Sequence, residues 1–480
     1  MANVPYNTGA LGLGIPTNNN FVSSFNAIKP DIDNKLTQRY GNQLLTGLID
    51  MVGYKRSTHN PAYSHFEERR YMPLIKAANG GAGAPNAAVT FTLDAAAQDA
   101  IAQNFEPFPS ASTVTKNGIP AIVGMVVLIK PASGAVDPTT YIQALITSVD
   151  IGAGTFSASP VVSGDAIPAV TVADEIIVIS TAFGDGSTQP ESMDTQVDEF
   201  KNRTQIFRWT WEVTGTMKNT KLWFETTNPN TGQKGYYWTY KGERDALYRF
   251  LNYREMGLLL GENLTNVTLY DVGATAGNPN KITEGLIPFI LTQGNTQNYS
   301  SVSGLTYEDM ENIVTCLDKQ KGSRNNLFMC GINLSLQIDR EFAAYLNNGA
   351  ITYGNYTFDN DLKVNFQFSD YKIGEYMFNK KTYDPFNDRN TLGADGYNFP
   401  FEGMIIPMDT QVDPKSGESI PSLSLRYLVS DDEDRHMRIN YFDGLSQGDN
   451  APDTEEVRYL SECGFEGFGG NRFFYVKKAS

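Results

Sequence analysis

The segment that most constrains the fold is residues 202–216, NRTQIFRWTWEVTGT, in which apolar and polar side chains alternate. The apolar positions are Phe207, Trp209, Trp211 and Val213, and the polar positions between them are Arg208, Thr210, Glu212 and Thr214. A period of two predicts a β-strand with one apolar and one polar face. Two indoles on one face need a broad surface to pack against, and that surface belongs either to the chain's own domain or to another molecule.

A second aromatic and basic segment, residues 63–74, resembles this strand in composition. We predict that residues 63–74 pair with residues 203–217 as a long antiparallel hairpin. Because a two-stranded ribbon is marginally stable by itself in water, we expect its apolar face to lie on a neighbouring copy of the chain. The residues expected at this assembly interface are Phe66, Arg69, Arg70, Tyr71, Phe207, Arg208, Trp209, Trp211 and Glu212.

The composition changes sharply between these two segments. Residues 77–200 contain thirteen Asp and Glu but only two basic residues, Lys116 and Lys130. Short β-like runs such as AIVGMVVLI and DEIIVISTAF are separated by glycine-containing turns. This pattern predicts an inserted small β-domain, either a barrel or a sandwich, at the far end of the hairpin.

The rest of the chain combines helices with strands. Residues 235–266 predict a long amphipathic helix of about 25 residues, which we call the spine helix. Thr306 and Asp309 form a capping-box pattern before a helix over 306–322. A strand over 326–334 and another helix capped by Ser335 follow. With the alternating strands nearby, these elements indicate a mixed sheet flanked by two helices.

Several functional classes are disfavoured by composition and motifs. The formal net charge of -16 argues against a free nucleic-acid binder, which needs a basic face. No signal peptide or membrane-spanning run is evident, and we expect neither a metal nor a cofactor. The cysteines (Cys316, Cys330, Cys463) and histidines (His59, His65, His436) lack metal-ligand spacing, so free thiols in a reducing compartment are expected. The absence of a recognisable catalytic motif argues against an enzyme.

The order of these elements resembles the major capsid protein of tailed bacteriophages, whose fold is named after phage Hong Kong 97. NRTQIFRWTWEVTGT is similar to the returning strand of that family's extended loop, where an Asn-x-Thr-Gln-Ile-Phe start and a Val-x-Gly-Thr finish recur. The large acidic insert and the Asn-rich N-terminus resemble those of crAss-like phages. The resemblance implies an α+β capsid fold with an N-terminal arm, an extended loop carrying the insert, a spine helix and an α/β axial domain.

The expected domains are 1–57 (arm with a helix), 58–76 with 200–234 (extended loop), 77–199 (inserted β-domain), 235–305 (peripheral domain), 306–445 (axial domain) and 446–480 (return strand). By resemblance, pentamers and hexamers of the chain would form an icosahedral head around double-stranded DNA. The virion would be its location, the host bacterial cytoplasm its place of synthesis, and portal, auxiliary or head-fibre proteins its partners. Packaged DNA would be touched only non-specifically, and no membrane is involved. The Lys, Asn and acid of the family's covalent cross-link do not map onto this sequence, so we expect non-covalent closure.

Two other readings remain open at this point. Acidic, aromatic and Asn-rich chains are common among carbohydrate-binding or glycan-cleaving proteins, although such a protein would be expected to carry an export signal. Another virion part, such as a tail tube subunit, would share arms and hairpins but form rings. The oligomeric form of the purified protein discriminates among these three readings.

Overall fold

The structure is a computed structural model of the 480-residue chain. It describes residues 54–68, 74–93, 121–130, 141–150, 153–171, 175–190, 197–227, 232, 234–264, 280–347, 370–412, 417, 419–430, 433–443 and 453–479. Two compact units divide the chain: among described residues, one comprises 210–248 with 440–443 and 453–457, and the other comprises the remainder. Residues 1–53 of the expected N-terminal arm, with its helix, lie outside the described residues.

Two strands distant in sequence, β2 (Ala62–Glu68) and β10 (Val197–Arg203), form a two-stranded ribbon. The strands are antiparallel, with Ala62 opposite Arg203 and Glu68 opposite Val197. The predicted pairing of 63–74 with 203–217 is therefore wrong in register and in the identity of the returning strand. The chain leaves the ribbon at Thr204, whose backbone N donates to the Pro61 carbonyl at 2.7 Å.

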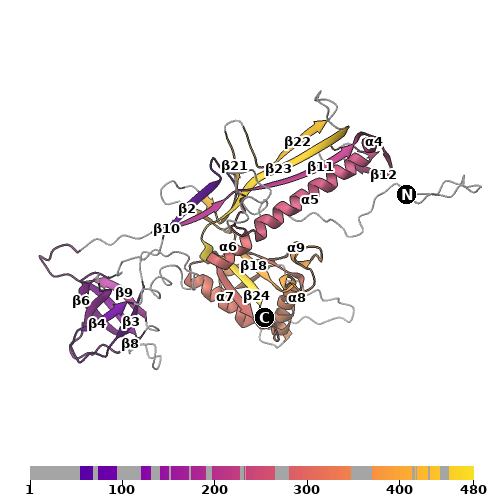
Figure 1. The fold of residues 1–480 in the computed structure, drawn as a ribbon. Coiled ribbons are helices and arrows are strands. Elements are labelled where there is room, and N and C mark those ends of the chain that lie inside the picture. Colours follow the sequence, from indigo (N-terminus) through magenta and orange to yellow (C-terminus); the bar gives the residue numbers. More distant parts are fainter. Residues whose placement is uncertain are drawn as a thin grey trace, which may run out of the picture. The chain divides into compact units, whose positions relative to one another are not determined.

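The tryptophan-bearing segment is a separate strand, β11 (Gln205–Thr214), in a five-stranded sheet. Its neighbours in that sheet are β1 (Tyr54–Thr58), β21 (Leu423–Leu428), β22 (Arg438–Asp443) and β23 (Thr454–Gly467). The order is β1-β21-β23-β11, with β22 also paired to β23. Figure 1 shows β11 running alongside the spine helix, α5 (Trp238–Leu260), whose 23 residues match the predicted length.

Beyond β11 the chain forms a short helix, α4 (Gly215–Lys218), and an antiparallel hairpin of β12 (Lys221–Thr227) with β13 (Lys234–Tyr237). Lys218 Nζ lies 2.8 Å from Glu455 Oε2 on β23. These elements lead directly into α5.

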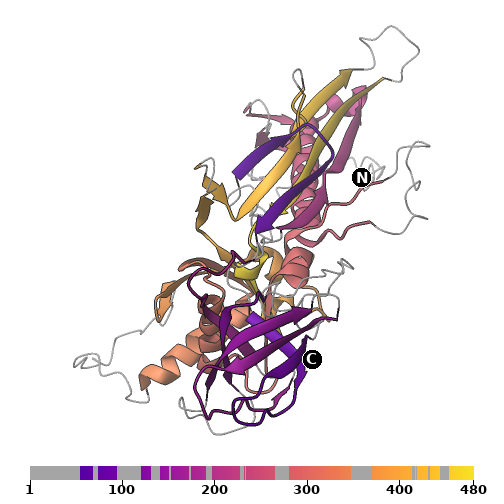
Figure 2. The ribbon, with the colours of Figure 1, turned by 90° about the vertical axis from the view of Figure 1, so that its left-hand side faces the viewer.

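Residues 74–181 contain seven strands that form one closed barrel. The strands are β3 (Leu74–Gly80), β4 (Val89–Leu93), β5 (Met125–Lys130), β6 (Ile142–Asp150), β7 (Thr155–Pro160), β8 (Val170–Thr171) and β9 (Glu175–Thr181). Their order is β4-β7-β6-β5-β9-β3-β8, and β4 also pairs with β3, which closes the sheet on itself (Figure 2). The barrel has its own aliphatic and aromatic core, in which Phe91 stacks on Phe156 at a centroid distance of 5.1 Å.

A second mixed sheet of six strands follows in the order β14-β24-β18-β15-β17-β16. These are β14 (Asn295–Tyr299), β15 (Asn325–Cys330), β16 (Asp370–Ile373), β17 (Tyr376–Thr382), β18 (Gly403–Pro407) and β24 (Phe474–Lys478). The helices around it are α6 (Leu286–Gln293), α7 (Tyr307–Lys319), α8 (Ile332–Asn347) and α9 (Asp384–Asn387), and shorter elements are η3 (Phe399–Phe401), β19 (Thr410–Val412) and β20 (Ser419–Pro421). Side chains of α7 and α8 share a core cluster with the sheet, as the sequence predicts.

Two details of this α/β part test the predicted helix starts. The capping box is confirmed: Thr306 Oγ1 accepts from the Asp309 backbone N, and Asp309 Oδ2 accepts from the Thr306 backbone N at 2.9 Å. Ser335 is not an N-cap, because α8 begins at Ile332 and the strand before it ends at Cys330. The cap comes from a distant residue instead, since Asn387 Oδ1 accepts from the Ile332 backbone N at 2.6 Å.

Candidate assembly site

Asn202 fixes the root of the β2–β10 ribbon to two other parts of the chain. Its amide nitrogen donates to the carbonyls of Phe465 at 2.7 Å and Glu284 at 3.0 Å. Its amide oxygen accepts from the backbone N of Glu284 at 3.0 Å and of Arg203 at 2.8 Å. One side chain thus uses both donor hydrogens and both lone pairs of its amide.

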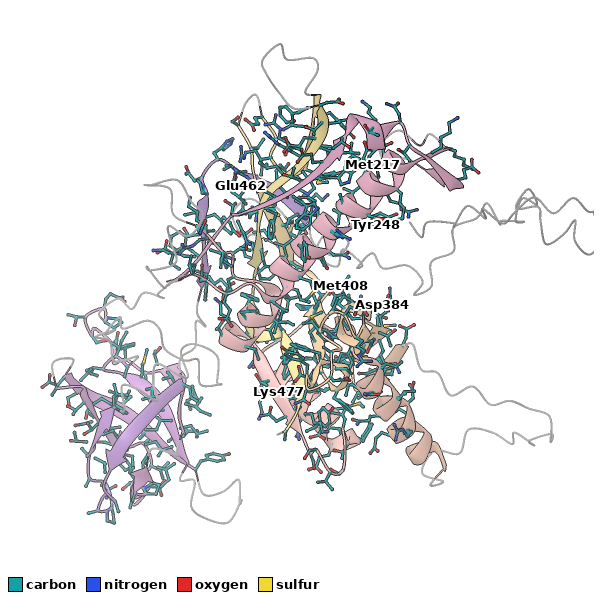
Figure 3. All side chains as sticks on the ribbon, turned by 45° about the vertical axis from the view of Figure 1, so that its right-hand side comes forward. Met217, Tyr248, Asp384, Met408, Glu462 and Lys477 are labelled. Carbon is teal, nitrogen blue, oxygen red and sulfur yellow. The ribbon has the colours of Figure 1, made fainter. Side chains whose placement is uncertain are left out.

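The next polar residues of the segment continue this anchor. Thr204 is fully buried, and its hydroxyl lies 3.3 Å from Glu462 Oε1 on β23 (Glu462 is labelled in Figure 3). Gln205 Oε1 accepts from the Thr283 backbone N at 3.2 Å. The Asn-x-Thr-Gln start of the segment therefore joins the ribbon to β23 and to the chain just before α6. Buried polar groups are satisfied in this way, which makes the junction specific.

Tyr63 secures the other strand of the ribbon to the same place. Its hydroxyl donates to the Phe465 carbonyl at 2.6 Å, and burial, with the nearby Glu466 carboxylate, raises the pKa of Tyr63 well above its ordinary value. The phenol therefore stays a neutral donor. A Cβ placed on Gly464 would lie 2.5 Å from both the Tyr63 hydroxyl and the Arg203 carbonyl, so the close approach of ribbon and β23 requires glycine there.

A buried carboxylate joins the ribbon to the sheet electrostatically. Glu466 is 2 % exposed and receives two hydrogen bonds from Arg426, at 2.6 and 3.0 Å. Ser424 donates to the same carboxylate at 2.9 Å, while Arg56 and His65 approach it at 3.7 and 3.8 Å. Bidentate pairing and an added hydroxyl satisfy a charge that would be costly to bury alone. Strands β1, β21, β23 and β2 therefore meet at this group.

The opposite face of the ribbon is exposed. Phe66 is 65 % exposed and stands opposite Glu199, while Ser64 stands opposite Lys201. Lys201 Nζ lies 2.8 Å from Glu199 Oε2, and this hydrogen bond lowers the pKa of Glu199. An exposed ion pair contributes little to stability, so its main effect is to place charges around Phe66. The ribbon presents an aromatic side chain bordered by both signs of charge.

The apolar face of β11 packs on the chain's own spine helix. Phe207 is buried. A Cβ atom added to Gly257 of α5 would lie only 2.6 Å from the Phe207 ring, so the ring packs directly on the helix at this glycine. Trp209 is half-buried, with its ring 5.3 Å from that of Tyr253. The described partner of these two side chains is the chain's own α5, and the expectation that this face meets a neighbouring copy stays a prediction.

Trp211 packs in the same manner. Trp211 is half-buried. A Cβ atom added to Gly242 of α5 would lie only 2.5 Å from the indole, so the ring packs closely on the helix where the glycine has no side chain. The sequence did not indicate this partner, because a period of two reports an apolar face but not what covers it.

The remaining predicted interface residues fall into two groups. Arg208 and Glu212 are exposed on the face of β11 that points away from α5. Arg69, Arg70 and Tyr71 lie outside the described residues. The residues that sequence reasoning missed are the anchor residues Asn202, Thr204 and Gln205. Their signal was a run of polar side chains at the start of an otherwise apolar strand.

Three further features of the described residues concern metal binding, membrane spanning and cysteines. No three His, Cys, Asp or Glu side chains converge there as metal ligands would. No helix in the same part of the chain is both long and apolar enough to cross a membrane. Cys330 and Cys463 are buried, and Cys316 is half-buried.

The amino-acid sequence was compared with models of known protein families. Residues 186–391 match the family model described as Crassvirus major capsid protein. This part of the chain is similar to the crassvirus major capsid proteins. The match supports the resemblance drawn from NRTQIFRWTWEVTGT and from the element order, and the described helices and strands are of the predicted α+β class. The matched region includes β10, β11, α5, α7 and α8.

Three solved structures that match most of this chain at low similarity come from two phages and a GTA particle. A chain of "Microbacterium phage Oxtober96" has a TM-score of 0.40 at 9% identity and covers 97% of this chain and 100% of its own. A chain of "Mycobacterium phage Bobi" has a TM-score of 0.39 at 7% identity, with coverage of 97% and 100%. "Capsid of native GTA particle computed with C5 symmetry" gives 0.37 at 7% identity, with coverage of 95% and 96%. No curated protein matches by sequence. The likeness to the crassvirus major capsid proteins rests on the sequence match over 186–391 rather than on these scores.

Proposed function

We propose that this phage major capsid protein assembles as pentamers and hexamers into an icosahedral head that encloses double-stranded DNA. The observation that carries the proposal is the family match over residues 186–391, which includes the returning ribbon strand, β11 and the spine helix. Closure is non-covalent, through contacts between ribbons, arms and neighbouring subunits. The role is structural, with no catalytic activity.

The ribbon acts as the arm that each copy lays on its neighbour. A free two-stranded ribbon is marginal in water, but here Asn202, Tyr63 and the Glu466 cluster hold its root. Its outward Phe66 is a large apolar group of the kind that anchors protein interfaces. Arg69, Arg70 and Tyr71 extend the same arm in sequence.

The exposed face of β11, with Arg208 and Glu212, contributes polar contacts at the rim of the same interface. Phe207, Trp209 and Trp211 act indirectly, because they hold β11 on α5 and so fix where that exposed face lies.

The net charge of -16 fits this role. It opposes premature association of free copies and weakens adhesion of packaged DNA, which is contacted only non-specifically. The protein is made in the host bacterial cytoplasm and resides in the virion. Portal, auxiliary and head-fibre proteins are its further partners.

The proposal is tested by native mass spectrometry and negative-stain electron microscopy of the purified full chain. We expect pentamers, hexamers or closed shells, and a Phe66→Ser variant should shift the population towards single copies. Tyr397→Ser is the matched control, since Tyr397 is an aromatic of similar exposure, 61 %, in the loop before η3. A wild-type chain that stays monomeric, or stacks only into rings, would overturn the proposal.

A further inference from the structure

The barrel of residues 74–181 carries aliphatic side chains on both faces of three adjacent strands. On the inner face, Ile75 of β3, Ile176 of β9 and Ile129 of β5 form one cross-strand row, and each is 0 % exposed. This inner row belongs to the barrel core and needs no further partner.

The outer face carries a second row directly behind the first. Leu74 stands opposite Ile177, and Ile177 stands opposite Leu128, so β3, β9 and β5 each contribute one residue. Ile179 follows two positions along β9 on the same face. We call Leu74, Leu128, Ile177 and Ile179 the outer aliphatic row. Ile177 and Ile179 are 43 % and 41 % exposed, and the other two are half-buried.

Such a row is not required for the barrel to fold. Strands with one solvated face alternate apolar and polar residues, whereas strands that are aliphatic on both faces are typical of sheets covered on both sides. A single exposed aliphatic residue is ordinary, but residues adjacent across three strands form a contiguous patch, and such patches mark interaction surfaces. The pattern therefore indicates that something covers the outer aliphatic row.

Charge indicates what covers it. The segment that contains the barrel, residues 77–199, has thirteen acidic and two basic residues. Residues 200–260, with β11 and α5, have the opposite balance, ten Lys and Arg against five Asp and Glu. An acidic domain with an apolar patch is complementary to an apolar surface bordered by basic groups. Residues 200–260 of another copy offer that chemistry, and a shell holds copies at high effective concentration.

We propose that the outer aliphatic row docks on a second copy of this chain, against its basic 200–260 region. The inference rests on the proposed shell function and adds a role for the acidic insert. Apolar burial supplies the contact, while the opposite charges orient it. The contact should therefore weaken, but not vanish, as the salt concentration rises.

The test places a photo-crosslinking amino acid at position 177 of the full chain. Particles are assembled from equal amounts of this variant in ¹⁴N form and of the unmodified chain in ¹⁵N form. Illumination followed by mass spectrometry then identifies each crosslinked pair by isotope. We expect ¹⁴N–¹⁵N pairs whose second site lies within 200–260. The control carries the same amino acid at position 162, because Val162 is 58 % exposed on the barrel but outside the row.

Mixed-isotope pairs that are frequent at position 177 and rare at 162 would support the proposal. Crosslinks only within one copy, only to another virion protein, or none at all in intact particles would overturn it while leaving the shell function standing. An unmodified chain that forms no multimeric particle would instead refute the proposed function. As a second measurement, particles of the Ile177→Thr, Ile179→Thr double variant are treated with a chemical crosslinking reagent. The yield of crosslinks between the barrel of one copy and residues 200–260 of another should fall several-fold relative to the unmodified chain, while the far-ultraviolet circular dichroism spectrum stays unchanged.

Discussion

At the scale of single residues, the polar start of NRTQIF explains how an arm can be held firmly at one end. The Asn202 side chain makes five hydrogen bonds to four other residues, and Thr204 and Gln205 add bonds to the same two parts of the chain, β23 and the segment before α6. Sequence reasoning found the capping box of Thr306 and Asp309 because both partners are three residues apart. It could not assign Asn202, because its partners Glu284 and Phe465 are more than eighty residues away.

Removing the Asn202 amide should destabilise the fold. Asn202→Ala removes the acceptor of the Glu284 N–H and one donor each from the Glu284 and Phe465 carbonyls in a largely buried junction, which we expect to cost about 3 kcal/mol of unfolding free energy. Asn219→Ala is the control, since the Asn219 amide makes an exposed bond to Gly215, and it should change stability by less than about 1 kcal/mol. Chemical denaturation measures both. Equal effects of the two variants would show that the junction is not held by Asn202.

The cysteines should differ in reactivity. Burial raises the pKa of the Cys330 thiol to about 12, and the thiolate is the form that alkylating reagents attack. At pH 8 the native chain should therefore be labelled by iodoacetamide at Cys316 first, with Cys330 and Cys463 protected. Peptide mass spectrometry reads each site, and the denatured chain should label at all three. Rapid native labelling of Cys330 would contradict its burial.

At the scale of elements, β11 and α5 show what a pattern predicts and what it leaves open. The length of the spine helix and the apolar face of β11 were both predictable, because each is a local periodicity. The partner of that face was not, since the glycines that admit the rings, Gly242 and Gly257, are visible only once helix and strand lie together. The wrong pairing of the ribbon has the same origin: alternation continues through Thr204, although the chain changes sheets there.

Gly257→Ala should destabilise the protein although alanine is the better helix former. The added methyl would lie 2.6 Å from the Phe207 ring, and we expect this overlap to cost about 2 kcal/mol after the gain in helix propensity is subtracted. Thermal unfolding and chemical denaturation measure the effect. Combining Gly257→Ala with Phe207→Leu should recover part of the loss, because the smaller side chain makes room. A Gly257→Ala chain as stable as the wild type would show that the strand does not press on the helix there.

At the scale of the whole molecule, composition predicted the acidic insert as a β-domain, and the pairings describe a closed barrel in residues 74–181. The sequence could not specify the barrel's order of strands, because short aliphatic runs of equal length have many possible partners. It also could not separate the ribbon face that we propose binds a neighbour from the strand face that packs on the spine helix. The account now assigns the first role to Phe66 and its surroundings and the second to Phe207, Trp209 and Trp211.

An electron cryo-microscopy map of particles assembled from the full chain tests this account most directly. We predict an icosahedral shell in which the exposed face of the β2–β10 ribbon, with Phe66 at its centre, is buried against an adjacent subunit while β11 remains on its own α5. A closed shell in which Phe66 faces solvent would contradict the assigned arm, and the absence of any shell would contradict the proposed function.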